Sequence, residues 1–194
     1  HNQFDQAIPY FKDIVKNHPN TKQAEYSANL LLDAYNLKKD YSGLEKTAAE
    51  LLSLPNISAS KAGKDIKVVL ERASFKKGQD LELSKNYLAS AEQYETFVKQ
   101  NPKSSLVAAA IFNAAINYER AEQKQRAIAA HLSLINLKGP SAEKLKVKSN
   151  RVLAKLYQEA GMMEKSAVMY SISAHEANND PLAPNLFFNA AVLF

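Results

Sequence analysis

Four basic residues with helical spacing are the most suggestive chemical feature of this sequence. Lys144, Lys148, Arg151 and Lys155 follow one another at steps of four, three and four residues. On an α-helix, such steps place the side chains on one face, so these residues form a single cationic stripe. A stripe of this kind could hold a carboxylate, because arginine donates two parallel hydrogen bonds to it and lysine acts as a point charge. The alternative is a solvated helix face, which is the ordinary role of a charge run.

The other side chains able to do chemistry are not arranged for catalysis. The four histidines, His1, His18, His131 and His175, lack metal-ligand spacing, and there is no glycine-rich phosphate loop. Cysteine is absent, which excludes disulfides and thiol nucleophiles. We therefore predict a protein that is not an enzyme and that uses neither a metal nor a cofactor.

The composition predicts a soluble chain that does not insert into a membrane. Its longest uninterrupted apolar run, 106–112, is far shorter than the roughly 20 residues that a spanning helix needs. The net charge of +5, from 25 basic and 20 acidic residues, is a mild excess that does not indicate a nucleic-acid partner. The chain begins at His1 without an initiator methionine or a signal-peptide pattern. We expect a fragment whose targeting segment, if there is one, lies elsewhere.

Apolar residues recur at helical spacing along the chain, and one eight-residue phrase occurs twice. The phrase IFNAAINY occupies 111–118, and FFNAAVLF occupies 187–194. Proline and glycine turn signals separate pairs of helix-length segments, which indicates a chain of helical hairpins. We interpret one aromatic residue as closing the first helix of each pair, at Tyr35, Phe75, Tyr118, Tyr157 and Phe194. After Phe75, six additional residues lengthen one turn or helix.

The periodicity predicts an all-α protein of about ten helices. We place them at 3–18, 21–38, 40–54, 59–78, 82–101, 103–122, 124–138, 141–160, 163–178 and 181–194. Pro9 lies inside the first of these, so that helix should be kinked or begin later. The predicted core consists of Phe11, Leu31, Tyr35, Tyr94, Phe97, Ala114, Ala115, Tyr118, Ala127, Leu153, Tyr157 and Tyr170.

The spacing within the hairpins resembles the tetratricopeptide repeat (TPR) family. The positions that fit it best in one repeat are Ile111, Ala114, Ala115, Tyr118, Ala127 and His131. The phrases YETFVKQNPKSS and YFKDIVKNHPNT further resemble a degenerate bacterial type, found in outer-membrane assembly lipoproteins and Tol-Pal coordinators. The resemblance implies a right-handed superhelical solenoid of antiparallel helix pairs that covers 1–194 as a single domain. We expect it to be truncated within a repeat at both ends, with self-association through the apolar faces of Phe187, Ala190, Ala191 and Phe194.

The same resemblance implies a concave groove lined by the first helix of each pair. The residues that line it are expected six and two positions before each closing aromatic residue. The cationic stripe contains two of these residues, Arg151 and Lys155, and adds Lys148 to them. The predicted partner-binding residues are Asn29, Asp33, Val69, Phe112, Ile116, Lys148, Arg151 and Lys155. The ligand expected there is a protein or peptide, with an apolar anchor followed by an acidic or carboxylate group.

The leading hypothesis is a scaffold that binds a partner protein or peptide in a bacterial cell-envelope complex, in the periplasm or at the envelope. A cytosolic co-chaperone or regulatory adaptor is the first alternative, and an export signal in the full-length precursor would distinguish the two. A polyanion-binding module is the second alternative, for which affinity should fall steeply with salt.

Overall fold

The computed structural model describes residues 2–176, 181 and 183–193, and for Asn2 only the backbone. These residues form helices and no strand, as the periodicity predicts. The helices are α1 (Asn2–Asn17), α2 (Lys22–Leu37), α3 (Tyr41–Leu52), α4 (Pro55–Ala59), α5 (Lys61–Leu83), α6 (Tyr87–Gln100), α7 (Val107–Arg120), α8 (Lys124–Asn136), α9 (Pro140–Glu159), α10 (Met163–Glu176) and α11 (Ala183–Leu193).

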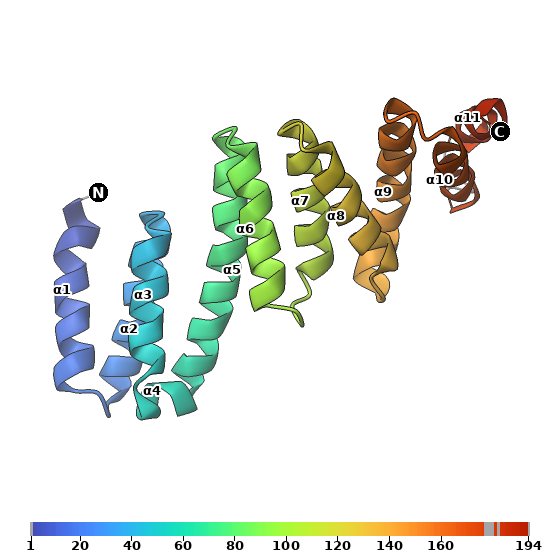
Figure 1. Cartoon of the computed structure of the whole chain (residues 1–194). Coiled ribbons are helices and arrows are strands. Elements are labelled where there is room, and N and C mark those ends of the chain that lie inside the picture. Colours follow the sequence, from blue (N-terminus) through green and yellow to red (C-terminus); the bar gives the residue numbers. More distant parts are fainter. Residues whose placement is uncertain (1, 177–180, 182, 194) are drawn as a thin grey trace. The chain divides into compact units, whose positions relative to one another are not determined.

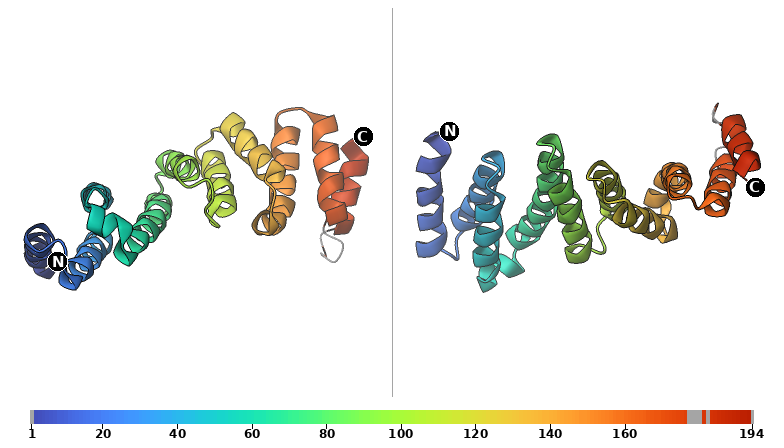
Figure 2. Two further views of the ribbon diagram at one scale, coloured as in Figure 1. Left: turned by 90° about the horizontal axis from the view of Figure 1, so that it is seen from below. Right: turned by 45° about the horizontal axis from the view of Figure 1, so that its top comes forward.

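The chain divides into two compact units, 1–77 and 78–194, here called the N-terminal and C-terminal units. The division falls within α5. In the N-terminal unit, α2 packs against α1 and α3, and in the C-terminal unit each helix from α6 to α11 packs against the next (Figures 1 and 2). Helix α7 also contacts α9, so the first helices of neighbouring hairpins touch.

Four turns between paired helices have the same backbone structure. In each, the residue four positions after the residue that closes the first helix has a positive φ, and the next N–H donates back to the carbonyl of the closing residue. These two features define the Schellman motif, which satisfies the last carbonyls of a helix. The residues with positive φ are Lys39 at 58°, Lys85 at 59°, Glu122 at 59° and Gly161 at 73°.

This shared turn corrects the expected frame of one hairpin. The N–H groups of Asp40, Gln123 and Met162 donate to the carbonyls of closing tyrosines, whereas Asn86 donates to Leu81 at 2.9 Å. Leu81, and not Phe75, therefore closes the first helix of this hairpin. The six additional residues extend α5, which with 23 residues is the longest helix described.

A pair of buried hydrogen bonds supports the corrected frame. The Ser90 hydroxyl donates to the carbonyl of Gly78 at 2.8 Å, and the Ser166 hydroxyl donates to that of Ala154 at 2.7 Å. In both cases the serine lies nine residues after the closing residue. At Gly78 an added Cβ would lie 2.9 Å from the Tyr94 ring, so the absence of a side chain lets the two helices approach.

Apart from the α5–α6 turn, helix boundaries differ from the expected ones mainly next to prolines. Pro55 starts α4, a five-residue helix that periodicity cannot detect because it is shorter than two turns. Pro102 begins a turn that delays the start of α7 to Val107. By contrast, α1 begins at Asn2 and continues through Pro9 rather than starting after it.

Ten of the twelve predicted core residues are buried. Phe11 and Tyr170 are half-buried instead. Phe11 lines an open surface hollow with Ile14 and Tyr26, and the Tyr170 hydroxyl reaches Gln158 at 3.4 Å on the exposed side of α10. Both positions have the right period for the core but lack a covering helix on one side.

The apolar face of α11 is only partly the expected one. Ala190 is 5% exposed because α11 packs against α10, and the Phe187 ring meets the His175 ring at 5.1 Å. Phe187 is exposed as expected, at 43%, and Phe188 and Val192 are more exposed, at 67% and 66%. Ala191 is exposed as expected, and Phe194 lies outside the described residues.

None of the helices in the described part of the chain has the length and hydropathy needed to cross a bilayer.

Candidate functional site

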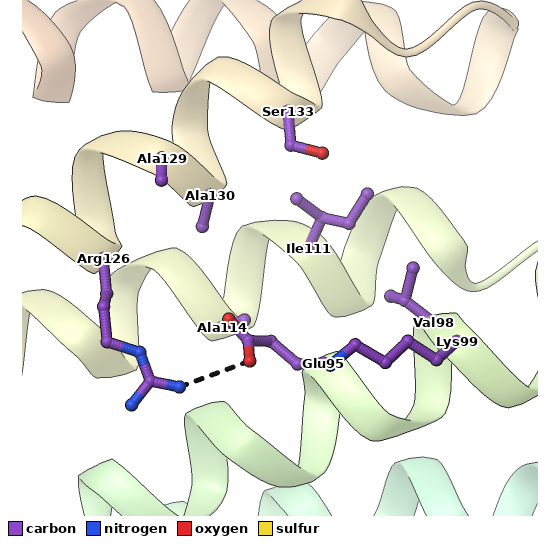
Figure 3. Close-up of a pocket in the computed structure, with 9 residues that line it drawn as sticks. All are labelled: Glu95, Val98, Lys99, Ile111, Ala114, Arg126, Ala129, Ala130 and Ser133. Carbon is purple, nitrogen blue, oxygen red and sulfur yellow. Dashed lines mark hydrogen bonds and ion pairs between the residues drawn. The ribbon is translucent and has the colours of Figure 1, made fainter.

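A groove lies between α6 and α8 in the C-terminal unit, with α7 as its floor (Figure 3). We name it the α6–α8 groove, and its volume is about 300 Å³. Its lining residues are Glu95, Val98 and Lys99 of α6, Ile111 and Ala114 of α7, and Arg126, Ala129, Ala130 and Ser133 of α8. This volume is at the low end of the about 300–1,000 Å³ typical of small-molecule sites, so it suits one or two apolar side chains.

Small residues create the hollow. Ala129 and Ala130 project from α8 toward the gap, and Ala114 lies on the floor, so no side chain fills the space between the helices. Val98 and Ile111 supply apolar walls. Helical periodicity predicts Ala114 as a core residue and gives no indication of the hollow.

Charged residues fix one end of the groove. The Arg126 guanidinium lies 4.1 Å from the centre of the Tyr118 ring and donates to Glu92 at 3.0 Å and to Glu95 at 3.3 Å. It also donates to the Tyr118 hydroxyl. Burial raises the pKa of Tyr118 above its usual range, and its hydrogen bond to Glu95 raises it further. Arg126 is thus held by a ring and two carboxylates. Lys99, in the last turn of α6, is the other cation in the lining.

The predicted site residues of the C-terminal unit lie on α7 and α9, outside this groove. Phe112 is half-buried with its ring 6.1 Å from the ring of His131, and Ile116 is half-buried. Arg151 is also half-buried and donates from Nε to the Ser173 hydroxyl of α10 at 3.3 Å. Phe112 and Arg151 therefore contact the second helix of their own hairpin. Arg151 does not extend freely from the first-helix face.

The lysines of the cationic stripe are exposed. Lys148 projects to solvent, and Lys155 has a side chain 65% exposed that lies 3.9 Å from Glu159. Glu159 is bound more closely by Lys124, at 2.8 Å. The hydrogen bond from Lys124 lowers the pKa of Glu159. The exposed part of the predicted stripe is therefore Lys148 and Lys155, together with Lys144.

The predicted site residues of the N-terminal unit differ in their exposure. Asp33 is exposed on α2, while Asn29 is half-buried and its Oδ1 has no hydrogen-bond partner among the described residues. Val69 packs against the core of the N-terminal unit. Val69 was predicted to line the groove because it lies six residues before Phe75, the expected closing residue. In the corrected frame, the equivalent positions are Phe75 and Gln79.

His131 is a buried packing residue. It is fully buried, its Nδ1 shares a hydrogen bond of 2.9 Å with the Ser149 hydroxyl, and its Nε2 has no partner in the described structure. Burial lowers the pKa of His131 to about 4, so the ring is neutral at pH 7. Within the described residues, no group of three or more histidine, aspartate or glutamate side chains could hold a metal ion.

No protein-family model matches this sequence, and no curated protein does. The structure itself defines the class as an all-α protein with repeated helical hairpins joined by equivalent turns.

Proposed function

We propose that this chain is a non-enzymatic scaffold of the TPR type that binds a segment of a partner protein in the α6–α8 groove. The observation that carries the proposal is the groove itself: an open apolar hollow between two helices, with a floor from a third and with Glu95, Lys99 and Arg126 as charged residues in its lining. Exposed apolar hollows with polar rims are typical of protein interaction sites. The TPR assignment is supported by the residue spacing and by the repeated turn.

The predicted setting is a complex of a bacterial cell envelope. It is supported by the resemblance of two phrases, IVKNHPNT and FVKQNPKS, to envelope proteins of this class. An export signal in the full-length precursor would support it, and a precursor without one would favour the cytosolic adaptor.

The exposed lysines of α9 give this unit a second contact surface for an acidic stretch of the partner. Lys148 and Lys155 are exposed on α9, and α9 contacts α7, the helix that carries Phe112 and Ile116. This surface would add attraction that salt weakens, while the apolar groove would supply affinity that salt leaves intact.

Selection of peptides tests the groove directly. A library of random 12-residue peptides displayed on phage is selected on the parent chain, and the selected peptides are measured against Ala130→Trp and Ser133→Trp. Both substitutions place an indole in the hollow, and Ser133 is exposed enough to accept it without disturbing the core. Ala160→Trp, at an exposed position outside the groove, is the matched control.

We expect the selected peptides to bind the parent and Ala160→Trp equally and to bind the two groove variants at least about tenfold more weakly. Tenfold corresponds to about 1.4 kcal/mol, which is less than burying one apolar side chain contributes. Peptides that bind all four proteins equally would show that recognition takes place elsewhere on the surface.

A further inference from the structure

The N-terminal unit contains a second groove with the same design. It lies between α1 and α3, with α2 as its floor, and its volume is about 270 Å³. We name it the α1–α3 groove. Its lining residues are Lys12, Val15, Lys16, Leu31, Thr47, Glu50, Leu51 and Leu54.

A constant offset of 83 residues relates the two grooves. Tyr35 and Tyr118 close equivalent helices with the same turn, and they are 83 residues apart. Adding 83 to six of the eight lining residues of the α1–α3 groove gives six of the nine lining residues of the α6–α8 groove. These pairs are Lys12 with Glu95, Val15 with Val98, Lys16 with Lys99, Leu31 with Ala114, Thr47 with Ala130, and Glu50 with Ser133.

Two of the six pairs are identical, so both grooves present the same valine and the same lysine to a ligand. Val15 and Val98 form an apolar wall at the same place, and Lys16 and Lys99 follow them on the exposed side of the helix. No ion pair of either lysine is found in the described part of the chain. Each groove therefore combines an unfilled apolar hollow with an ammonium group at the same position on its edge.

The carboxylates near Lys99 are already engaged. Glu92 and Glu95 both bind Arg126, so the lysine is left as the group able to attract an anion. In the α1–α3 groove, Lys12 replaces Glu95, and its ammonium lies 5.7 Å from the centre of the Tyr35 ring. Glu50 also lines the α1–α3 groove, but Lys12 and Lys16 outnumber it by one, as Lys99 and Arg126 outnumber Glu95 in the α6–α8 groove. Both edges thus favour a ligand with negative charge next to its apolar part.

We infer that the chain carries two copies of one binding site, and that both accept a peptide segment in which a bulky apolar side chain is followed by a carboxylate. The inference rests on the proposed function and specifies its ligand and its stoichiometry. The apolar side chain fills the hollow next to Val15 or Val98, and the carboxylate pairs with Lys16 or Lys99 at the edge. One chain would then bind two such segments.

Methyl NMR on the full chain tests this site by site. The probe is the acetylated and amidated peptide Gly-Leu-Phe-Glu-Gly, with a twin that has glutamine in place of glutamate. Methyl resonances of Val15 and Leu31 report on the α1–α3 groove, and those of Val98 and Ile111 report on the α6–α8 groove.

We expect the glutamate peptide to shift both sets of resonances, and the glutamine twin to bind about 2–5-fold more weakly at both, as for the loss of one exposed charge pair. Lys16→Glu should weaken only the shifts in the α1–α3 groove, and Lys99→Glu only those in the α6–α8 groove. The matched controls, Lys67→Glu and Lys103→Glu, change exposed lysines that line neither groove and should leave both sets unchanged.

Three results would overturn the inference. Shifts confined to Val98 and Ile111 would leave the proposed function intact and exclude a second site. Equal binding of the two peptides would exclude the carboxylate contact. If neither the probe nor the phage-selected peptides shift any methyl group of either groove, the inference and the proposed function are both wrong.

Discussion

The buried His131 makes the stability of this protein sensitive to mild acid. Its folded pKa of about 4 lies below the unperturbed value of 6.5, and the cause is burial of the ring. Because the folded state disfavours the protonated ring, the free energy of unfolding is highest above pH 6.5 and declines as the pH falls from 6.5 to about 4. Its Nε2 has no partner in the described structure, so no group there stabilises the added proton.

The magnitude follows from the shift. Each pKa unit corresponds to about 1.36 kcal/mol. A shift from 6.5 to about 4 therefore lowers the free energy of unfolding by roughly 3 kcal/mol once the pH is below 4, and by about 2 kcal/mol at pH 5. At pH 5 most carboxylates remain ionised. The effect of His131 can therefore be separated from general acid unfolding.

Urea unfolding at pH 7.5 and pH 5 measures this effect in the parent and in His131→Phe. Phenylalanine suits the site because the equivalent position of α6 is the buried aromatic residue Tyr94. The variant loses the hydrogen bond to Ser149 at both pH values, so this loss cancels in the comparison between them. We expect the parent to lose about 2 kcal/mol more than the variant between the two pH values. If both proteins lose the same amount, protonation of His131 does not govern the acid response.

Three further predictions concern the turns, the core and the α9 surface. Glu122→Gly should raise the free energy of unfolding by about 0.5–1 kcal/mol, because glycine adopts a positive φ without steric strain. Gly161→Ala should lower it by about 1 kcal/mol, because a side chain is strained at a positive φ. The opposite order in urea unfolding would refute the turn argument. Ala115→Leu should lower the free energy of unfolding by about 1–3 kcal/mol because Ala115 is fully buried, and a melting curve like that of the parent would mean that space exists there. The double change Lys148→Glu and Lys155→Glu should weaken binding of an acidic partner by about 1 kcal/mol per charge at low salt. At about 0.5 M salt the same change should have little effect, because salt screens exposed charges. A loss of affinity that does not depend on salt would exclude electrostatic attraction.

The sequence alone determined the secondary structure class and most of the core. Helical periodicity predicts which residues share a face, and ten of twelve predicted core residues are buried for that reason. It also revealed the repeated hairpins, because equivalent helices meet similar neighbours and keep similar spacing.

Periodicity did not determine where the α5 hairpin closes. Phe75 and Leu81 are both apolar residues of the same helix, and the helix continues past the first to the second. The turn that follows has Lys85 in the left-handed conformation, where glycine would have marked the end of the helix in the sequence. The hydrogen bonds from Asn86 to Leu81 and from Ser90 to Gly78 identify the closing residue, and both are features of the tertiary structure.

The grooves were likewise decided by tertiary structure. The α6–α8 groove exists because three helices meet where Ala114, Ala129 and Ala130 leave space unfilled, and a helical period carries no information about which neighbouring helix fills a gap. The same limit applies to Arg151, which has the period of an exposed stripe but contacts Ser173 of α10. A helix face is a property of the sequence, whereas its neighbours are a property of the assembled fold.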